Sequence, residues 1–282
     1  MKICRFDDDR LGLVSGNEVI DVSAALTAPA VKPWPLPRED WLIANLDRVC
    51  SAIRQAEGGA RHRLKDVRLL SPIANPGKII GAPVNYRAHL DEANADRQIS
   101  AGTTVKTIDH YGLFLKANSS LVGPAEGVML GLKSRRNDHE GELVVVIGRA
   151  CRNVQEANAL DYVAGYCAGL DMTVRGVEER SLRKSLDSYT VLGPWLTTVD
   201  EVDDPGDLLI HLEVNGEVRQ HCSTAHLIFS VKKLIAYASE FYSLYPGDVI
   251  MTGTPAGVGP VTAGDTISLT IEKLGAMDVA VR

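Results

Sequence analysis

The chain has no long apolar run, and nothing at its start resembles a targeting segment. No stretch of about 18 apolar residues occurs in its 282 residues, which excludes a helical membrane span. The first ten residues, MKICRFDDDR, turn acidic without forming a continuous apolar segment, so they lack the pattern of a secretory signal. These absences predict a soluble protein of the cytoplasm.

Excess positive charge is also missing. The formal net charge is -6 at pH 7. Nucleic acids and anionic membranes attract proteins through a basic surface, so we expect neither as a partner. A small anionic substrate would have to be bound by cations that gather locally.

Paired cysteines and phosphate-binding glycine motifs are absent. The five cysteines are spread over the chain without a C-x-x-C pair, which argues against a disulfide framework or a thiolate zinc site and fits a reducing cytosol. Neither G-x-x-x-x-G-K-[ST] nor G-x-G-x-x-G occurs in the glycine-rich residues 252–259 (TGTPAGVG), so a nucleotide site has no support. That segment suits either an anionic group or a plain turn.

Residues 1–70 predict a small N-terminal α/β domain. Short alternating strands are expected at residues 2–6, 12–14 and 18–21. A proline-rich link at residues 29–37 leads to residues 38–57, whose apolar side chains recur at helical spacing, and Gly58-Gly59 ends that helix. After residue 70 the chain changes to strands separated by glycines, so we place the domain boundary there.

Residues 71–282 predict one larger domain made mostly of strands. The expected strands are residues 78–82, 113–116, 142–147, 163–171, 195–198, 208–214, 249–252 and 266–271. Asn215-Gly216 suits the type I′ turn of a hairpin, and residues 227–245 carry the clearest helical stripe. The expected fold class is therefore mixed α+β and rich in β-structure.

Three acidic residues alternate in NDHEGELVVVIG, residues 137–148. In a strand Asp138, Glu140 and Glu142 would share one face, where their carboxylates repel one another. A solvated edge strand tolerates this repulsion, and a hard divalent cation cancels it because such ions take oxygen ligands. The segment alone favours solvent, and the rest of the chain must decide.

Several other patterns are weak when each is taken singly. His89 precedes Glu92 by three positions, so on a helix the carboxylate would orient the imidazole as a water-activating base; a surface salt bridge is the alternative. Asp171 ends an apolar strand, where a turn or a helix cap is its ordinary role. Lys116 and Lys184 offer a point charge to a carboxylate or an enolate, or are solvated surface residues.

The order of these motifs resembles the fumarylacetoacetate hydrolase family. The matching motifs are N-Y-x-x-H-x-x-E (residues 85–92), F-L-K (114–116), E-x-E entering V-V-V-I-G (140–148), A-G-x-D-M-T (168–173), K-S-x-D with L-G-P-W (184–195) and T-G-T-P-A-G-V-G (252–259). The resemblance covers about residues 70–282. It implies the β-sheet roll of that family with a small N-terminal domain, in a protein that usually forms a homodimer.

The resemblance also implies a site. Glu140, Glu142 and Asp171 match the ligands of Mg²⁺ or Mn²⁺. His89 and Glu92 match the water-activating pair on a lid over the substrate. Three further positions match groups near the substrate, namely Lys184, Lys116 and Thr254. Asp138 lies outside the matched triad and is expected behind the ligands or exposed.

The chain departs from the family pattern in two places. Related proteins that process acylpyruvates often carry glutamine seven residues after the metal aspartate, where this chain has Glu178. A carboxylate there cannot donate a hydrogen bond unless it is protonated, so we expect Glu178 to alter recognition of substrate oxygens. The lid span, residues 90–112, is longer than many in the family and is expected to influence selectivity.

The resemblance implies a hydrolase that acts on a carbon–carbon bond in a ketonic substance. The expected substrate is an acylpyruvate such as fumarylpyruvate or maleylpyruvate, cleaved to pyruvate and a carboxylic acid in the catabolism of aromatic compounds. Oxaloacetate decarboxylation and a hydroxymuconate-type isomerase or hydratase are the alternatives. A metal-dependent binding or scaffold protein without turnover is the alternative outside enzymes, although metal binding alone would not need His89, Glu92 and Lys184.

Overall fold

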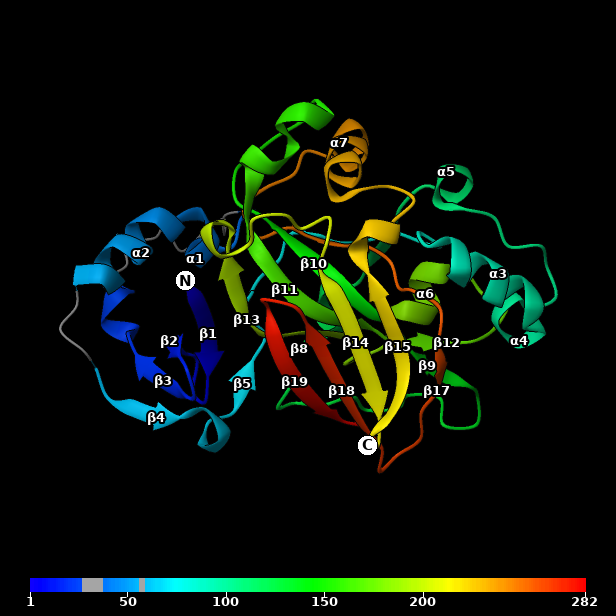
Figure 1. Ribbon diagram of the computed structural model, residues 1–282, viewed down its shortest axis with the longest axis horizontal. Helices are drawn as coiled ribbons and strands as arrows, with labels where there is room; N and C mark the ends of the chain where they lie inside the picture. The colour runs from blue at the N-terminus through cyan, green and yellow to red at the C-terminus, as the bar shows by residue number, and fades with distance from the viewer. Residues whose placement is uncertain (27–37, 56–58) are drawn as a thin grey trace.

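The computed structural model describes residues 1–26, 38–55 and 59–282. Its largest sheet has 12 strands (Figure 1). The main path of this sheet runs in the order β4-β3-β2-β1-β13-β11-β10-β16-β6-β7, with β5 paired to β1 and β8 paired to β13. Its strands are β1 Lys2–Phe6, β2 Arg10–Ser15, β3 Glu18–Asp21, β4 Arg61–Arg63, β5 Leu69–Leu70, β6 Ile79–Gly81, β7 Phe114–Lys116, β8 Leu121–Val122, β10 Gly141–Ile147, β11 Val163–Asp171, β13 Thr190–Thr198 and β16 Val249–Met251.

Two smaller sheets complete the β-structure. A four-stranded sheet has the order β15-β14-β18-β19, and a three-stranded sheet has the order β12-β9-β17. Their strands are β9 Asn137–His139, β12 Thr173–Val174, β14 Leu209–Val214, β15 Glu217–Ser223, β17 Gly259–Pro260, β18 Thr266–Ile271 and β19 Gly275–Ala280. Figure 1 shows the four-stranded sheet packed across β10 and β11. The predicted mixed α+β fold, rich in strands, is therefore confirmed.

The core lies between the large sheet and the four-stranded sheet. Successive side chains of a strand point to opposite faces, so Leu143 and Val145 of β10 pack into the larger apolar cluster together with Leu212 of β14. Val144 and Val146 point the other way, into a second cluster. β10 is buried on both faces, which explains its unbroken apolar run and fixes its register.

The helices are short and lie outside the sheets. They are α1 Trp41–Ala44, α2 Leu46–Gln55, α3 Arg87–Ala95, α4 Arg97–Ser100, α5 Ile108–Tyr111, α6 Arg180–Lys184 and α7 Val231–Phe241. The helix expected at residues 38–57 is split at Asn45, and its predicted end at Gly58, like the link at residues 29–37, lies outside the described residues. α7 is shorter than expected because the Ser230 side chain caps its start and Tyr242 is extended.

The strands predicted for the large domain are present, one of them with clearly different bounds, and further strands form that were not predicted. β13 begins at Thr190, five residues before the expected start, and continues through Pro194. The pairing of β13 with β11 is interrupted between Tyr166 and Ala168, next to the Ala168 and Gly193 pair, so the ladder does not need a donor from Pro194. β19 was not expected at all, because its sequence GAMDVA is poor in β-branched residues.

The N-terminal strands extend the large sheet. β1 pairs with β13, and β5 returns to pair with β1. The first 70 residues also have an apolar cluster of their own, which includes Leu11, Val49 and Ile53. A domain boundary near residue 70 stays a prediction. Among the helices of the described residues, none combines the length and apolar character needed to cross a lipid bilayer.

Asp40 ties the N-terminal segment to the rest of the chain. Its buried carboxylate caps α1 by accepting a hydrogen bond from Ile43 N at 3.1 Å, and it also accepts bonds from Ala74 N at 3.1 Å and Asn75 N at 2.9 Å. In Asp40→Ala these amides lose their acceptor, so we expect the free energy of unfolding to fall by about 2–4 kcal/mol.

Urea denaturation measures this loss. The matched control is Asp66→Ala, which removes an exposed ion pair with Arg63 and should change stability by less than about 1 kcal/mol. A loss for Asp40→Ala no larger than that of the control would show that the Asp40 contacts contribute little.

Candidate metal and catalytic site

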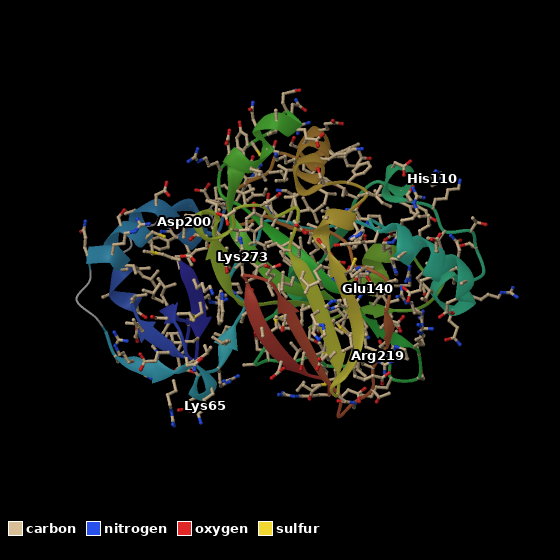
Figure 2. All side chains as sticks on the ribbon, in the orientation of Figure 1. Lys65, His110, Glu140, Asp200, Arg219 and Lys273 are labelled. Carbon is tan, nitrogen blue, oxygen red and sulfur yellow. The ribbon has the colours of Figure 1, made fainter. Side chains whose placement is uncertain are left out.

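The candidate site is a cavity of about 220 Å³ at the ends of β10 and β11. Its walls come from α3, α6, the lid residues 99–111 and the glycine-rich residues 252–259. Figure 2 shows Glu140 on the side of the molecule that carries α3 and α6, far from Asp200 and Lys65. The cavity therefore belongs to the large β-rich part of the chain.

Three carboxylates meet in this cavity. Each of Glu140, Glu142 and Asp171 offers an oxygen within 4.8 Å of the others, and all three are buried. The antiparallel pairing of β10 with β11 brings them together, because Gly141 pairs with Leu170 and Asp171 N donates to Glu140 O at 2.9 Å. The solvated-strand interpretation of residues 137–148 is therefore wrong, as is the helix-cap interpretation of Asp171.

Buried cations partly balance the three carboxylates. Lys184 Nζ donates to Glu140 Oε2 at 2.6 Å, to Asp171 Oδ2 at 2.7 Å and to Thr173 Oγ1 at 2.6 Å. Lys116 Nζ donates to Asp171 Oδ1 and, at 2.9 Å, to Tyr189 O. A buried lysine keeps its positive charge only when a negative charge lies beside it. The lysines and the carboxylates of this site therefore stabilise one another.

The three carboxylates differ in how far nearby positive charges offset their negative charge. Burial raises the pKa of Glu140, but Lys184 and Arg175 outweigh it and hold that pKa well below its ordinary value. Burial, together with the neighbouring charge of Asp171, raises the pKa of Glu142 well above its ordinary value. Glu142 Oε2 accepts one backbone bond, from Gly253 N at 2.8 Å. Glu142 is thus the carboxylate with the greatest demand for a further positive charge.

Asp138 lies behind the triad and is fully buried. Its carboxylate accepts hydrogen bonds from Arg136 Nε and Arg175 Nε, both at 2.7 Å. Arg175 also donates to Glu140 Oε1 at 2.9 Å, so it bridges Asp138 and Glu140. Of the two alternatives for Asp138, the exposed one is wrong.

His89 and Glu92 form the expected pair on α3. His89 Nδ1 lies 2.9 Å from Glu92 Oε2, while Glu92 Oε1 accepts a bond from Gly257 N at 2.8 Å. The buried imidazole lines the cavity, and Glu92 lies behind it. Within the described part of the chain no other group hydrogen-bonds the ring, which leaves Nε2 available to a ligand. This geometry differs from a surface salt bridge.

The predicted substrate contacts fall into different places. Thr254 lines the cavity and is held by Gln220, which donates to its Oγ1 at 2.7 Å. Lys116 lies beneath Asp171 and is not part of the lining. Glu178 lines the cavity but pairs with both terminal nitrogens of Arg135 at 2.9 and 2.8 Å, and this pairing lowers the pKa of Glu178 to about 2. The predicted roles of these residues in substrate recognition stay predictions.

Sequence reasoning missed the arginines of the lining. Arg175, Arg180 and Arg183 reach the cavity from the segment that carries α6. A signal existed, because residues 175–184 contain four basic residues in a chain whose net charge is -6. An acidic chain with an anionic ligand needs such a local cluster.

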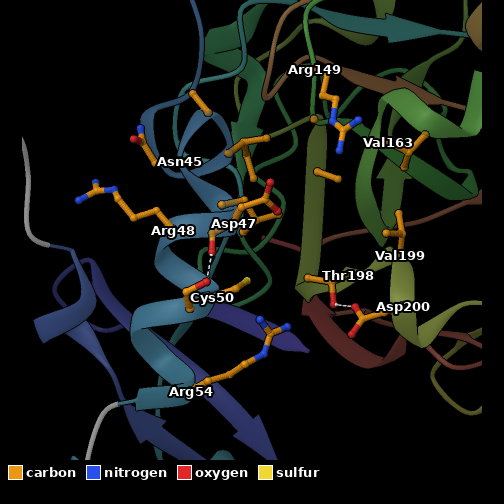
Figure 3. A pocket seen from close by; sticks show the side chains of 16 residues that line it. Asn45, Asp47, Arg48, Cys50, Arg54, Arg149, Val163, Thr198, Val199 and Asp200 are labelled. Carbon is orange, nitrogen blue, oxygen red and sulfur yellow. Dashed lines mark hydrogen bonds between the residues drawn. The ribbon is translucent and has the colours of Figure 1, made fainter.

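A larger cavity of about 640 Å³ lies between α2 and the large sheet (Figure 3). Arg54 extends from α2 toward the strand that carries Thr198, and Arg149 reaches in from the opposite side. Asp47 and Asp200 also line it, and Thr198 Oγ1 donates to Asp200. Among the residues that the structure describes, Glu140, Glu142 and Asp171 are the one group of three with metal-binding spacing, so the chemistry belongs to the smaller cavity.

The fold and this triad define the family of the chain. The sequence profile described as fumarylacetoacetate (FAA) hydrolase C-terminal matches residues 78–282, which include every site residue named above. The chain belongs to the fumarylacetoacetate hydrolase family, and the resemblance inferred from its motifs is confirmed.

Its relatives include proteins named as hydrolases. The chain is 56% identical over 285 residues to a maleylpyruvate hydrolase of Aquipseudomonas alcaligenes, covering 100% of this chain and 99% of that protein. It is 36% identical to a 2,4-didehydro-3-deoxy-L-rhamnonate hydrolase of a Sphingomonas strain, covering 98% and 94%. A crystal structure of maleylpyruvate hydrolase from Sphingobium sp. SYK-6, in complex with manganese(II) and pyruvate, matches with a TM-score of 0.83 at 40% identity, covering 100% and 98%.

Proposed function

We propose that this chain is a metal-dependent hydrolase that cleaves the carbon–carbon bond of maleylpyruvate, or of a closely similar acylpyruvate, to pyruvate and a carboxylic acid. A place in the catabolism of aromatic compounds follows from that substrate class. One observation carries the proposal: a buried carboxylate triad and His89, which Glu92 holds from behind, line the same small cavity, in a chain 56% identical along its whole length to a maleylpyruvate hydrolase.

The triad fits a divalent ion such as Mg²⁺ or Mn²⁺. All the available donors are carboxylate oxygens, which hard cations prefer. Burial and the neighbouring charge of Asp171 raise the pKa of Glu142, and a bound cation would act in the opposite direction. Glu140, Glu142 and Asp171 would hold the ion. When bound, it supplies Lewis acidity toward the oxygens of the α-keto acid end of the substrate.

The residues of the chain supply the proton transfers. Glu92 accepts a hydrogen bond from Nδ1–H of His89, and Gly257 N donates to Glu92 from behind, so Nε2 is the ring nitrogen that takes a proton from water. The water oxygen adds to the distal carbonyl carbon of the substrate. The bond between that carbon and the methylene carbon then breaks, and its electron pair leaves with pyruvate as the enolate. The Lys184 ammonium lies at the cavity to stabilise this negative charge and to return a proton.

The alternatives make less use of this geometry. Decarboxylation of oxaloacetate needs no attacking water and so leaves the oriented His89–Glu92 pair without a task. An isomerase or hydratase of hydroxymuconate-type compounds lacks the support of a relative as similar as the maleylpyruvate hydrolase. A scaffold protein that merely binds metal would need the triad alone.

A pyruvate-release assay tests the proposal. We expect the purified protein with Mn²⁺ to release pyruvate from maleylpyruvate faster than from fumarylpyruvate, and from both faster than from oxaloacetate. Hydrolysis is recognised by the second product, because maleate forms from maleylpyruvate while oxaloacetate yields carbon dioxide. Absence of pyruvate from both acylpyruvates would contradict the proposal, and release from oxaloacetate alone would favour decarboxylation.

Metal binding should stabilise the protein. A ligand that binds only the folded state at 100 times its Kd adds about 2.7 kcal/mol, which corresponds to roughly 5 °C or more in a domain of this size. We therefore expect Mn²⁺ to raise the Tm of protein that has been treated with a chelator, and excess chelator to reverse the change. Potassium at the same ionic strength is the control. An equal Tm with and without Mn²⁺ would contradict a folded-state metal site.

We also propose a homodimer in the cytoplasm, with residues 1–70 forming a small N-terminal domain. Five free cysteines suit a reducing compartment. Leu182 and Met129 are large apolar side chains that lie exposed on the monomer, and a second copy would cover such groups. Light scattering at several protein concentrations measures the mass, and a mass of about 30 kDa at all of them would contradict the dimer.

A further inference from the structure

Arg180 is the first residue of α6 and lines the cavity. Its guanidinium carbon lies 4.7 Å from the ring centre of Tyr111 and 5.9 Å from that of Phe114. Both rings also line the cavity. Contacts of a guanidinium with aromatic faces fix its position and leave the N–H groups at its edge free to donate.

The other cations of the cavity are already bonded within the protein. Lys184 donates to Glu140, Asp171 and Thr173. Arg175 is shared between Asp138 and Glu140. Arg183 donates from Nε to Glu178 O at 2.8 Å and from Nη1 to Val174 O at 3.3 Å.

Arg180 has no comparable partner. Among the described residues, no carboxylate or carbonyl accepts a hydrogen bond from it, and no acidic side chain lies within ion-pair distance. Burial lowers the pKa of Arg180, and the charges of Glu140, Glu179 and Asp171 act on it in the opposite direction without forming an ion pair with it. A guanidinium held this way recognises planar anions, because its fork matches the two oxygens of a carboxylate.

We propose that Arg180 binds the terminal carboxylate of the acyl group and thereby selects acylpyruvates that end in a carboxylate. This inference rests on the proposed function and names the part of the substrate that the triad does not hold. The α-keto acid end is assigned to the metal ion that the triad would hold, so the second carboxylate of a dicarboxylic substrate needs a cation elsewhere in the cavity. Arg180 supplies that cation, with five N–H donors and none of them used within the described chain.

The lid, residues 90–112, contributes to the proposed carboxylate-binding site at Arg180. Tyr111 is the last residue of α5 and stacks on Arg180 from the lid, while Phe114 stacks from β7. Residues 90–112 thus place the ring of Tyr111 against Arg180. Tyr111→Ala should weaken selection of the dicarboxylic substrate in the same direction as a change of Arg180, and to a smaller extent.

Two substrates and two variants test the assignment. Maleylpyruvate carries the terminal carboxylate, whereas acetylpyruvate has the same reacting group and ends in a methyl group. For Arg180→Met we expect kcat/KM for maleylpyruvate to fall roughly 10- to 100-fold, chiefly through KM, because a charge-assisted pair is lost. The value for acetylpyruvate should stay within about 2-fold. Arg180→Lys keeps the charge but loses the fork, so it should restore part of the loss.

Ser181→Ala is the matched control, because Ser181 lies on the same helix and does not line the cavity. It should leave both substrates unaffected. Equal losses of Arg180→Met on both substrates, or no loss on maleylpyruvate, would overturn the role of Arg180 while leaving the hydrolase proposal intact. Inactivity of the unaltered protein on both acylpyruvates would instead overturn the hydrolase proposal, and the Arg180 assignment with it.

Discussion

Replacing His89 by alanine is expected to lower kcat for maleylpyruvate hydrolysis by about 10²- to 10⁴-fold, with little change in KM. His89 lines the cavity with Nε2 available, and Glu92 and Gly257 hold it in place from behind. Its proposed task is to take a proton from the attacking water, which affects the chemical step and not substrate binding. Steady-state kinetics with saturating Mn²⁺ measures the loss.

Two further variants show whether the effect of His89→Ala is specific to its role as the base. Glu92→Gln keeps an acceptor for Gly257 N but removes the negative charge beside Nδ1, so a smaller loss of roughly 10- to 100-fold is expected. His110→Ala, at an exposed lid position, should retain full activity. Any residual decarboxylation of oxaloacetate should survive in His89→Ala, because that reaction needs no water. Retention of more than a tenth of kcat in His89→Ala would contradict its role as the base.

Glu142→Gln is expected to abolish the response to metal. The substitution preserves the shape of a buried side chain and removes the charge that is least compensated within the protein. Loss of one carboxylate ligand should lower metal affinity and reduce kcat/KM by at least about 100-fold, since Lewis acidity contributes several kcal/mol to such reactions. Calorimetric titration with Mn²⁺ and the hydrolysis assay measure the two effects separately.

The melting temperature of the Glu142→Gln variant shows whether Glu142 is a metal ligand or only stabilises the fold. Three carboxylates within 4.8 Å of one another destabilise the metal-free fold, so Glu142→Gln should unfold at the same temperature as the metal-free parent or above it. The increase in Tm caused by Mn²⁺ should be lost in this variant. Glu240→Gln, an exposed change on α7, should keep the full increase. A Tm for metal-free Glu142→Gln well below that of the parent would indicate that Glu142 serves stability instead.

The spacing of apolar residues predicted most strands of the large sheet, because this spacing is a local property of the sequence. The apolar run of β10 and the long strand β11 were read directly from the sequence, and both are buried on both faces as such runs require. The helical spacing of His89 and Glu92 predicted their contact on α3. The predicted start of β13 was wrong, because Thr190 and Val191 pair with β11 and β8, and local periodicity does not show such long-range pairing.

The burial of the acids was not a local property. Residues 137–148 alone favoured solvent, since repelling carboxylates are ordinarily exposed. Their burial depends on Asp171, Lys184 and Arg175, which lie far away in the sequence and converge through the pairing of β10 with β11. The order of the motifs along the chain carried that long-range information, which the spacing of any single motif could not.

Arg180 shows a different limit. No motif of the sequence marks it, because its distinction is a missing partner, and a missing partner can be recognised only when all neighbours are placed. Its neighbours Tyr111 and Phe114 come from separate elements, α5 and β7. Sequence reasoning predicted that cations must gather near the substrate but could not say which of them keeps its hydrogen-bond donors for it.

The central claim is that this cavity hydrolyses an acylpyruvate with the help of a metal ion held by Glu140, Glu142 and Asp171. The most direct test is the rate of maleate and pyruvate formation from maleylpyruvate by chelator-treated protein, before and after Mn²⁺ is added. We predict a negligible rate before the addition and equal, rapid formation of both products after it. The same rate in both conditions, or no product in either, would contradict the account.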